Sequence, residues 1–193
     1  MQKVEAYIDE IFPASSVRLR KPESITYAEL HADAFDDYLK LDPFQHTIWE
    51  EGNRHACERQ RLRNGDIVFV YRKKKFRPAL VTSWHEIWAE ENKIYLLPSI
   101  GMMVIRPKEL KYAMWLIIFF KTHCHIVDTW LQERLKPSEL IEKLLSMEIE
   151  TPPDDAVLAS YENYNDLLHI HYKSMIEIKA LLEKNDKKLS YMF

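Results

Sequence analysis

The sequence contains few glycines and no glycine-rich loop. Its 193 residues include three glycines, Gly52, Gly65 and Gly101, and no two of them are near neighbours. Loops that cradle a nucleotide phosphate need closely spaced glycines, because only glycine lets the backbone approach the phosphate oxygens. The P-loop and the Rossmann turn are therefore excluded as motifs.

Cysteines and long apolar runs are also scarce. The two cysteines, Cys57 and Cys124, lie far apart and cannot staple a fold of this length. The first residues, MQKVEAYIDEIFP, place acids inside the apolar stretch, unlike a signal peptide. The longest apolar run, residues 113–120 (AMWLIIFF), is far shorter than the roughly 20 residues that span a bilayer. We therefore expect a cytoplasmic protein without a membrane partner.

The usual catalytic signatures are missing. The chain has no GxSxG, HExxH or CxxC motif. His123 and His125 would share one face of a strand, but zinc needs further ligands that the sequence does not supply. Residues 109–111 (ELK) and 177–179 (EIK) match a fragment of many nucleases without the Pro-Asp partner on a preceding strand. We expect a protein that is not an enzyme and has no cofactor or metal, with a small nuclease as an open alternative.

Positive charge is concentrated in one stretch of an otherwise acidic chain. The formal net charge is -3, yet residues 61–81 (RLRNGDIVFVYRKKKFRPALV) are rich in Arg and Lys. Apolar residues 67–71 and 79–84 predict two strands of a hairpin with a charged tip at 72–77. Such a tip places cations within reach of adjacent phosphates. The alternative is a solvated tip whose lysines protect a sheet edge.

This stretch supplies the candidate DNA-binding residues. They are Arg61, Arg63, Arg72, Lys73, Lys74, Lys75, Arg77 and Ser83. Lys and Arg would supply affinity for phosphate, whereas Arg72, Arg77 and Ser83 are the candidates for contacts with base edges. Arg18, Arg20 and Lys21 form a second basic cluster that would join the same surface.

The remaining patterns predict a mixed α+β fold with a central, mainly antiparallel sheet and helices behind it. Thr26 and Glu29 have the spacing of a capping box, which predicts a helix through residue 41. Residues 44–64 look like a loop with a short helical piece. Further short strands are expected near Trp88 and at 94–97, 102–105 and 147–150, and helices at 108–123 and 137–145.

The C-terminal segment has the clearest periodicity. Apolar or aromatic positions recur at heptad spacing at Val157, Tyr161, Tyr164, Leu168, His171, Met175, Ile178 and Leu182. We expect a globular domain over residues 1–150 and, within residues 151–193, a long helix over 154–188. A coiled coil with another helix is one interpretation, since a period near 3.5 favours supercoiling. A surface helix packed along its own globule is the other.

The order of the motifs carries a resemblance. In sequence they are residues 62–69 (LRNGDIVF), 104–108 (VIRPK), Tyr112, residues 135–140 (LKPSEL), residues 148–153 (EIETPP) and the terminal helix. This order, over residues 60–190, resembles one half of the DNA-specificity subunit of type I restriction-modification systems.

The resemblance implies a fold and a function. Each half in that family is a target recognition domain, an α/β globule that reads a short half-site, followed by a long helix that pairs with its counterpart. It implies a non-enzymatic, sequence-specific DNA-binding module of a restriction or related phage-defence system. Its partners would be double-stranded DNA and DNA methyltransferase or restriction subunits, in a homodimer or hetero-oligomer formed through the helix. The alternative is a protein-interaction subunit of a defence or toxin complex that does not bind DNA.

Overall fold

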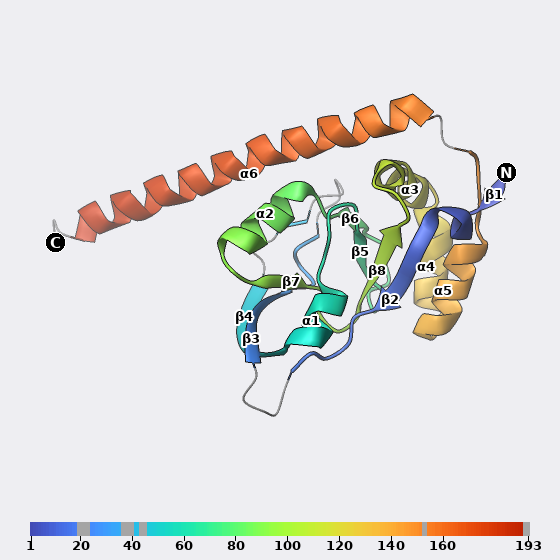
Figure 1. The fold of residues 1–193 in the computed structure, drawn as a ribbon, viewed down its shortest axis with the longest axis horizontal. Helices are drawn as coiled ribbons and strands as arrows, with labels where there is room; N and C mark the ends of the chain where they lie inside the picture. The colour runs from blue at the N-terminus through green and yellow to red at the C-terminus, as the bar shows by residue number, and fades with distance from the viewer. Residues whose placement is uncertain (19–23, 36–40, 43–45, 152–153, 191–193) are drawn as a thin grey trace.

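The fold is α+β, as the sequence predicts, with mostly antiparallel strands. The computed structural model describes residues 1–18, 24–35, 41–42, 46–151 and 154–190 (Figure 1). The strands in these residues are β1 (Gln2–Lys3), β2 (Ile8–Pro13), β3 (Ser24–Leu30), β4 (His46–Asn53), β5 (Ile67–Val70), β6 (Ala79–Leu80), β7 (Tyr95–Leu97), β8 (Met102–Pro107) and β9 (Glu148–Ile149). The helices are η1 (Val4–Tyr7, 3-10), α1 (Arg54–Gln60), α2 (Ser83–Glu91), α3 (Lys111–Thr122), α4 (Cys124–Gln132), α5 (Pro137–Ser146) and α6 (Asp154–Ser190).

A four-stranded antiparallel sheet, in the order β2-β8-β5-β6, divides two apolar cores. Successive residues of a strand point to opposite faces, and β5 shows this directly. Ile67 and Phe69 enter one core, whereas Val68 enters the other. The central strands are therefore buried on both faces.

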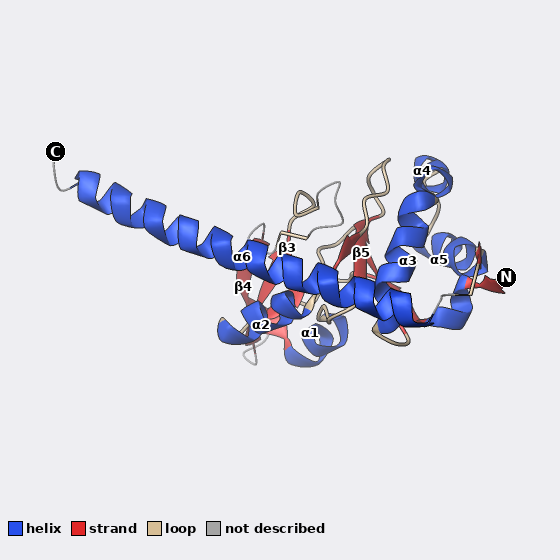
Figure 2. Ribbon diagram, turned by 90° about the horizontal axis from the view of Figure 1, so that it is seen from above, coloured by secondary structure: helices blue, strands red, loops and turns tan. Residues whose placement is uncertain are grey.

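Helices α3, α4 and α5 cover the first core (Figures 1 and 2). The apolar run of residues 113–120 lies in α3, where Leu116, Ile117 and Phe120 are fully buried. The predicted helices after Pro107 and Pro137 are confirmed as α3 and α5. The last predicted short strand is confirmed as β9, which pairs with β1.

The second sheet contradicts the predicted helix that starts near Thr26. It has the order β4-β3-β7, with β3 antiparallel to β4 and parallel to β7. Ala28 and Leu30 face the second core, and Tyr27 and Glu29 face the other way. The capping-box spacing was misleading because long-range strand pairing outweighs a local helix signal. Residues 46–53, predicted as loop, form β4, and residues 36–40 lie outside the described residues.

The predicted hairpin is confirmed as β5 and β6, but its second strand is shorter than predicted, and the strand predicted near Trp88 is wrong. The second hairpin strand ends at Leu80, and helix α2 begins at Ser83 and includes Trp84 and Trp88. Thr82 and His85 form a capping box at the N-terminus of α2, with His in place of the usual Glu or Gln, so the sequence pattern does not reveal it.

The two histidines that were expected to share one face of a strand also lie elsewhere. His123 ends α3, and His125 lies in α4, so the two do not share a strand face. The His123 ring bonds locally to the carbonyl of Phe119, at 2.9 Å. Because α3 and α4 are separated without Pro or Gly, sequence alone gave no sign of the break.

Helix α6 occupies the segment for which a long helix was predicted. It starts beside the N-terminus, crosses α3 and α2, and its second half projects away from the globule (Figures 1 and 2). Leu168 and Tyr172 are buried in a cluster with Trp84 of α2. The first half of the helix therefore packs on its own globule.

This packing divides the predicted heptad seam. Tyr164 and Leu168 contact the globule, Met175 is half-buried, and His171 and Ile178 are exposed. The side chains of Val157, Tyr161 and Leu182 lie outside the described residues. Tyr172, which is not in the seam, is fully buried. The seam residues thus do not form one free stripe, and pairing through them stays a prediction.

Candidate nucleic-acid interface

The basic loop, residues 71–78, joins β5 to β6. Its cationic side chains are all exposed: Arg72, Lys73, Lys74, Lys75 and Arg77. Between them Phe76 and Pro78 are buried. The apolar residues hold the loop on the sheet while the charges face solvent.

Phe76 anchors the loop to the first core. Its ring lies edge-on to Phe69 at 4.8 Å and to Phe120 at 6.2 Å between centroids. Its backbone N–H donates to Oδ1 of Asp128 in α4, with an N–O distance of 2.5 Å. A charge-assisted bond and aromatic packing therefore fix the middle of the basic loop.

The turn before β8 holds the start of the loop. The Tyr71 N–H donates to the Gly101 carbonyl at 3.0 Å. Gly101 has a φ of 102°, and a Cβ there would lie 3.0 Å from Cδ of Arg72. Glycine allows this backbone conformation and lets the Arg72 side chain lie against the turn.

One of the cations is partly neutralised. Nζ of Lys73 lies 3.2 Å from Oδ1 of Asp33 and donates to the Ala32 carbonyl at 3.0 Å. Both charged side chains are substantially exposed, so this ion pair is weak. It ties the basic loop to the segment that follows β3.

The structure does not bring all the predicted DNA-binding residues together. Arg61 and Arg63 precede β5, whereas the basic loop follows it, so they lie at opposite ends of the strand. Ser83 lies at the same end as Arg63, because the Val81 N–H bonds to the Asp66 carbonyl. The Ser83 hydroxyl donates to Oδ1 of Asn165 in α6 at 2.9 Å. Among the predicted DNA-binding residues, the structure therefore groups those of the basic loop into one compact cluster.

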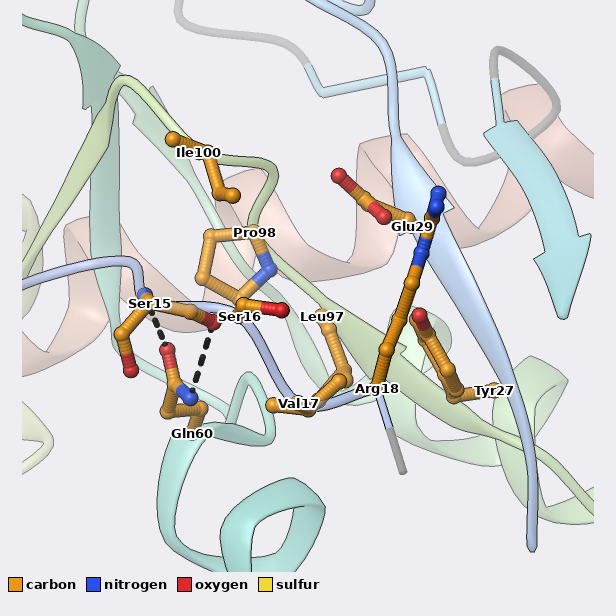
Figure 3. Close-up of a pocket in the computed structure, with 10 residues that line it drawn as sticks. All are labelled: Ser15, Ser16, Val17, Arg18, Tyr27, Glu29, Gln60, Leu97, Pro98 and Ile100. Carbon is orange, nitrogen blue, oxygen red and sulfur yellow. Dashed lines mark hydrogen bonds between the residues drawn. The ribbon is translucent and has the colours of Figure 1, made fainter. Parts of the chain in front are cut away.

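Three depressions extend this interface along the second sheet. Their volumes are about 200, 340 and 210 Å³. Lys73, Lys75 and Arg77 line the first, which shares Ala32 with the second. The second and third share Arg18 and Glu29. A continuous uneven surface thus leads from the basic loop to the outer face of β3, and Figure 3 shows its far end.

Arg18 is held in a defined position on this surface. Its Cζ lies 3.7 Å from the centre of the Trp49 ring, which is a cation–π contact. Burial raises the pKa of Tyr27, a hydrogen bond from Arg18 opposes this, and the charge of Glu29 adds to the rise. Arg18 was predicted to join the DNA-binding surface, and Arg20 and Lys21 lie outside the described residues.

Sequence reasoning missed Glu29, Thr47 and Trp49. Strand pairing places Glu29 opposite Thr47, and Tyr27 opposite Trp49, on the face that carries Arg18. The alternation of Ala28 and Leu30 with more polar neighbours was the available signal for β3.

Groups suited to other chemistry are not assembled in the described residues. No group of three or more His, Cys, Asp or Glu side chains among them could hold a metal ion. Burial raises the pKa of the Cys57 thiol to about 11, so it stays protonated at neutral pH. In the part of the chain that the structure describes, no helix is both long and apolar enough to cross a membrane.

Comparison with known proteins adds no assignment. No model of a protein family matches the chain, and no curated protein matches it significantly.

Proposed function

We propose that this protein is a sequence-specific DNA-binding module without catalytic activity of its own. It would deliver a partner methyltransferase or nuclease to a site, as the resemblance to type I specificity subunits implies. The observation that carries the proposal is the basic loop, in which five exposed cations surround a buried aromatic anchor. A rigidly held cationic loop can contact phosphates without first being ordered.

The loop would act mainly through phosphate contacts. Each phosphate that a Lys or Arg neutralises releases bound counterions, so affinity falls steeply with salt. If four or five cations of the loop contact phosphates, the association constant should fall about 10²- to 10³-fold between 50 and 200 mM salt.

Retention on random duplex DNA at these two salt concentrations tests the proposal. The test variant changes Lys73, Lys74 and Lys75 together to Glu, and it should lose retention while its thermal unfolding is unchanged. A control with the same change in net charge places Glu at the exposed positions Lys3, Arg59 and Lys173. Equal retention by the two variants would reject the loop as the contact surface.

A second candidate function is a protein-interaction subunit, and helix α6 favours it. The exposed apolar side chains Leu167, Ile170, Ile178 and Leu181 lie on one face by their helical spacing. Three of these four lie outside the predicted seam; only Ile178 belongs to both. We propose that this face pairs with α6 of a second copy or with a helix of a partner subunit. Such pairing is compatible with DNA binding and would bring two globules together.

A further inference from the structure

We infer that Arg18 and Glu29 read a G·C base pair in the duplex that the basic loop holds. The inference rests on the proposed function and names the site that would supply its specificity. Phosphate contacts carry no sequence information, so the loop alone does not select a target.

The position of the two side chains suits this role. Arg18 and Glu29 both line two adjoining depressions, so they form the divide between them. Figure 3 shows both side chains at one side of the third depression. Arg18 is exposed and Glu29 is half-buried, so the charged groups of both side chains can reach solvent.

The Arg18 side chain has hydrogen-bond donors that match the acceptors of guanine. Its guanidinium is a planar fork of N–H donors, and guanine presents two acceptors, N7 and O6, at its major-groove edge. The contact with Trp49 holds the cation in place, and its bond with Tyr27 leaves other donors available. A side chain held in this way loses little conformational entropy on binding.

Glu29 supplies the complementary group. Its carboxylate only accepts hydrogen bonds when ionised, and cytosine presents an N4 donor in the major groove. Strand β3 fixes its backbone, because Glu29 pairs with Thr47 on one side and Leu97 on the other. One G·C pair offers both the acceptors for Arg18 and the donor for Glu29.

The basic loop is close enough to serve the same duplex. Arg72 lies against Gly101, and the adjacent Ile100 lines the depression that contains Arg18. Lys73 bonds to the carbonyl of Ala32, which lies in the turn three residues beyond Glu29, so the backbones of Ala32 and Glu29 are at most about 10 Å apart. The major groove is about 12 Å wide, so cations at its rim and a reading group at its floor have this order of separation.

Selection of bound duplexes from a random pool tests the inference with the full chain. The wild type should enrich a motif that contains a fixed G·C pair. Arg18→Ala and Glu29→Gln should each reduce discrimination at that pair by about 5- to 150-fold. Arg18→Lys, which keeps the charge and donors but loses the rigid planar fork, should weaken the same preference less than Arg18→Ala does. Ile100→Ala, an apolar change in the same depression, should leave the motif unchanged.

Replacing the guanine of that pair with 7-deazaguanine gives a second readout. It should weaken the wild type and leave Arg18→Ala unaffected, because the N7 acceptor is removed. Motifs that are identical in the wild type, Arg18→Ala and Glu29→Gln would overturn the inference while the loop's role in binding stands. A wild type that retains no duplex at low salt would instead overturn the proposed function, and the inference with it.

Discussion

Asp66, immediately before β5, forms a buried bidentate ion pair with Arg106 of β8. Nε of Arg106 lies 2.9 Å from Oδ1 of Asp66, and Nη2 lies 2.9 Å from Oδ2. The same guanidinium donates to the Arg61 carbonyl at 3.2 Å, and Asp66 accepts from the Arg63 N–H at 2.8 Å. Burial raises the pKa of Asp66, and its bonds with Arg106 oppose that rise. Two sequence motifs, GDI and VIRPK, thus meet in one structural contact.

The substitution Asp66→Asn should therefore lower the free energy of unfolding. The substitution removes the buried counter-charge of Arg106 and leaves only the half-exposed Glu10 beside the guanidinium, which costs up to about 3 to 5 kcal/mol. Urea unfolding measures the loss. Glu10→Gln is the matched control, because Glu10 pairs with the same arginine at 3.2 Å but is half-exposed. We expect a change of less than about 1 kcal/mol there. Similar losses in both variants would contradict a special role of the buried pair.

Asp128→Asn should loosen the basic loop. The amide oxygen is a weaker acceptor for the Phe76 N–H than the carboxylate, so the loop should open more often. Limited trypsin digestion should then cut faster after Lys73, Lys74 or Lys75, with little change in thermal unfolding. Glu133→Gln, which affects a long ion pair with Lys143 on the neighbouring surface, should not change the rate. Equal rates in all three proteins would show that Asp128 does not hold the loop.

Stability should decrease as the pH is lowered from neutrality to about 4. His85 is fully buried, and burial lowers its pKa from 6.5 to about 4. Between pH 6.5 and about 4, the unfolded chain binds a proton that the folded protein does not. The free energy of unfolding therefore decreases as the pH is lowered through this range. The shift corresponds to about 3 kcal/mol for this residue.

Comparison with a variant isolates this effect. His85→Gln keeps hydrogen-bonding groups but does not titrate, so its unfolding free energy should depend less on pH over that range. His125→Gln removes an exposed histidine and should keep the wild-type dependence. Denaturant unfolding at pH 7, 6, 5 and 4 gives both curves, and parallel curves for wild type and His85→Gln would refute the assignment.

Tyr172→Ala should release the first half of α6 from the globule. Its ring stacks on Trp84 at 3.9 Å, and its hydroxyl donates to the Leu41 carbonyl. Removing a buried aromatic ring costs about 3 to 5 kcal/mol. Hydrogen exchange should accelerate near residues 164–172, whereas Ile170→Ala, at an exposed position, should leave exchange there unchanged. Protection that persists in Tyr172→Ala would mean that other contacts hold the helix.

Self-association should depend on the exposed face of α6. Changing Ile170 and Ile178 together to Glu places charge on that face and should reduce dimerisation at least tenfold if two copies pair there. Sedimentation at several concentrations measures it. Ser174 lies between them on the same face, so Ser174→Ala is a mild control that should retain association. A wild type that is monomeric throughout would reject pairing between copies of this chain.

The helices with local signals were predictable from sequence. Proline fixes the backbone at the start of α5 and precedes α3, and an apolar run or periodicity continues from each. Asn64 and Gly65, residue types that favour turns, likewise form the turn before β5. In these segments the local preference and the tertiary environment agree.

The second sheet was not predictable in the same way. The pairing of Tyr27 with Trp49, and of Tyr27 with Tyr95, joins segments far apart in sequence. A single sequence without pairing information leaves the capping-box interpretation of Thr26 and Glu29 equally plausible. The same limit applies to the candidate site: its cations are adjacent in sequence and were found, whereas the neighbours of Arg18 come from β3 and β4.

The four-stranded sheet between the two cores restricts how the globule can be divided. Ile67 and Val68 pack into opposite cores, and all four residues of β5 pair with β8. Removal of either strand would therefore expose both cores on one side. The two halves of the globule on either side of this sheet should therefore not be exchangeable one at a time, because each half needs the shared strands for its core.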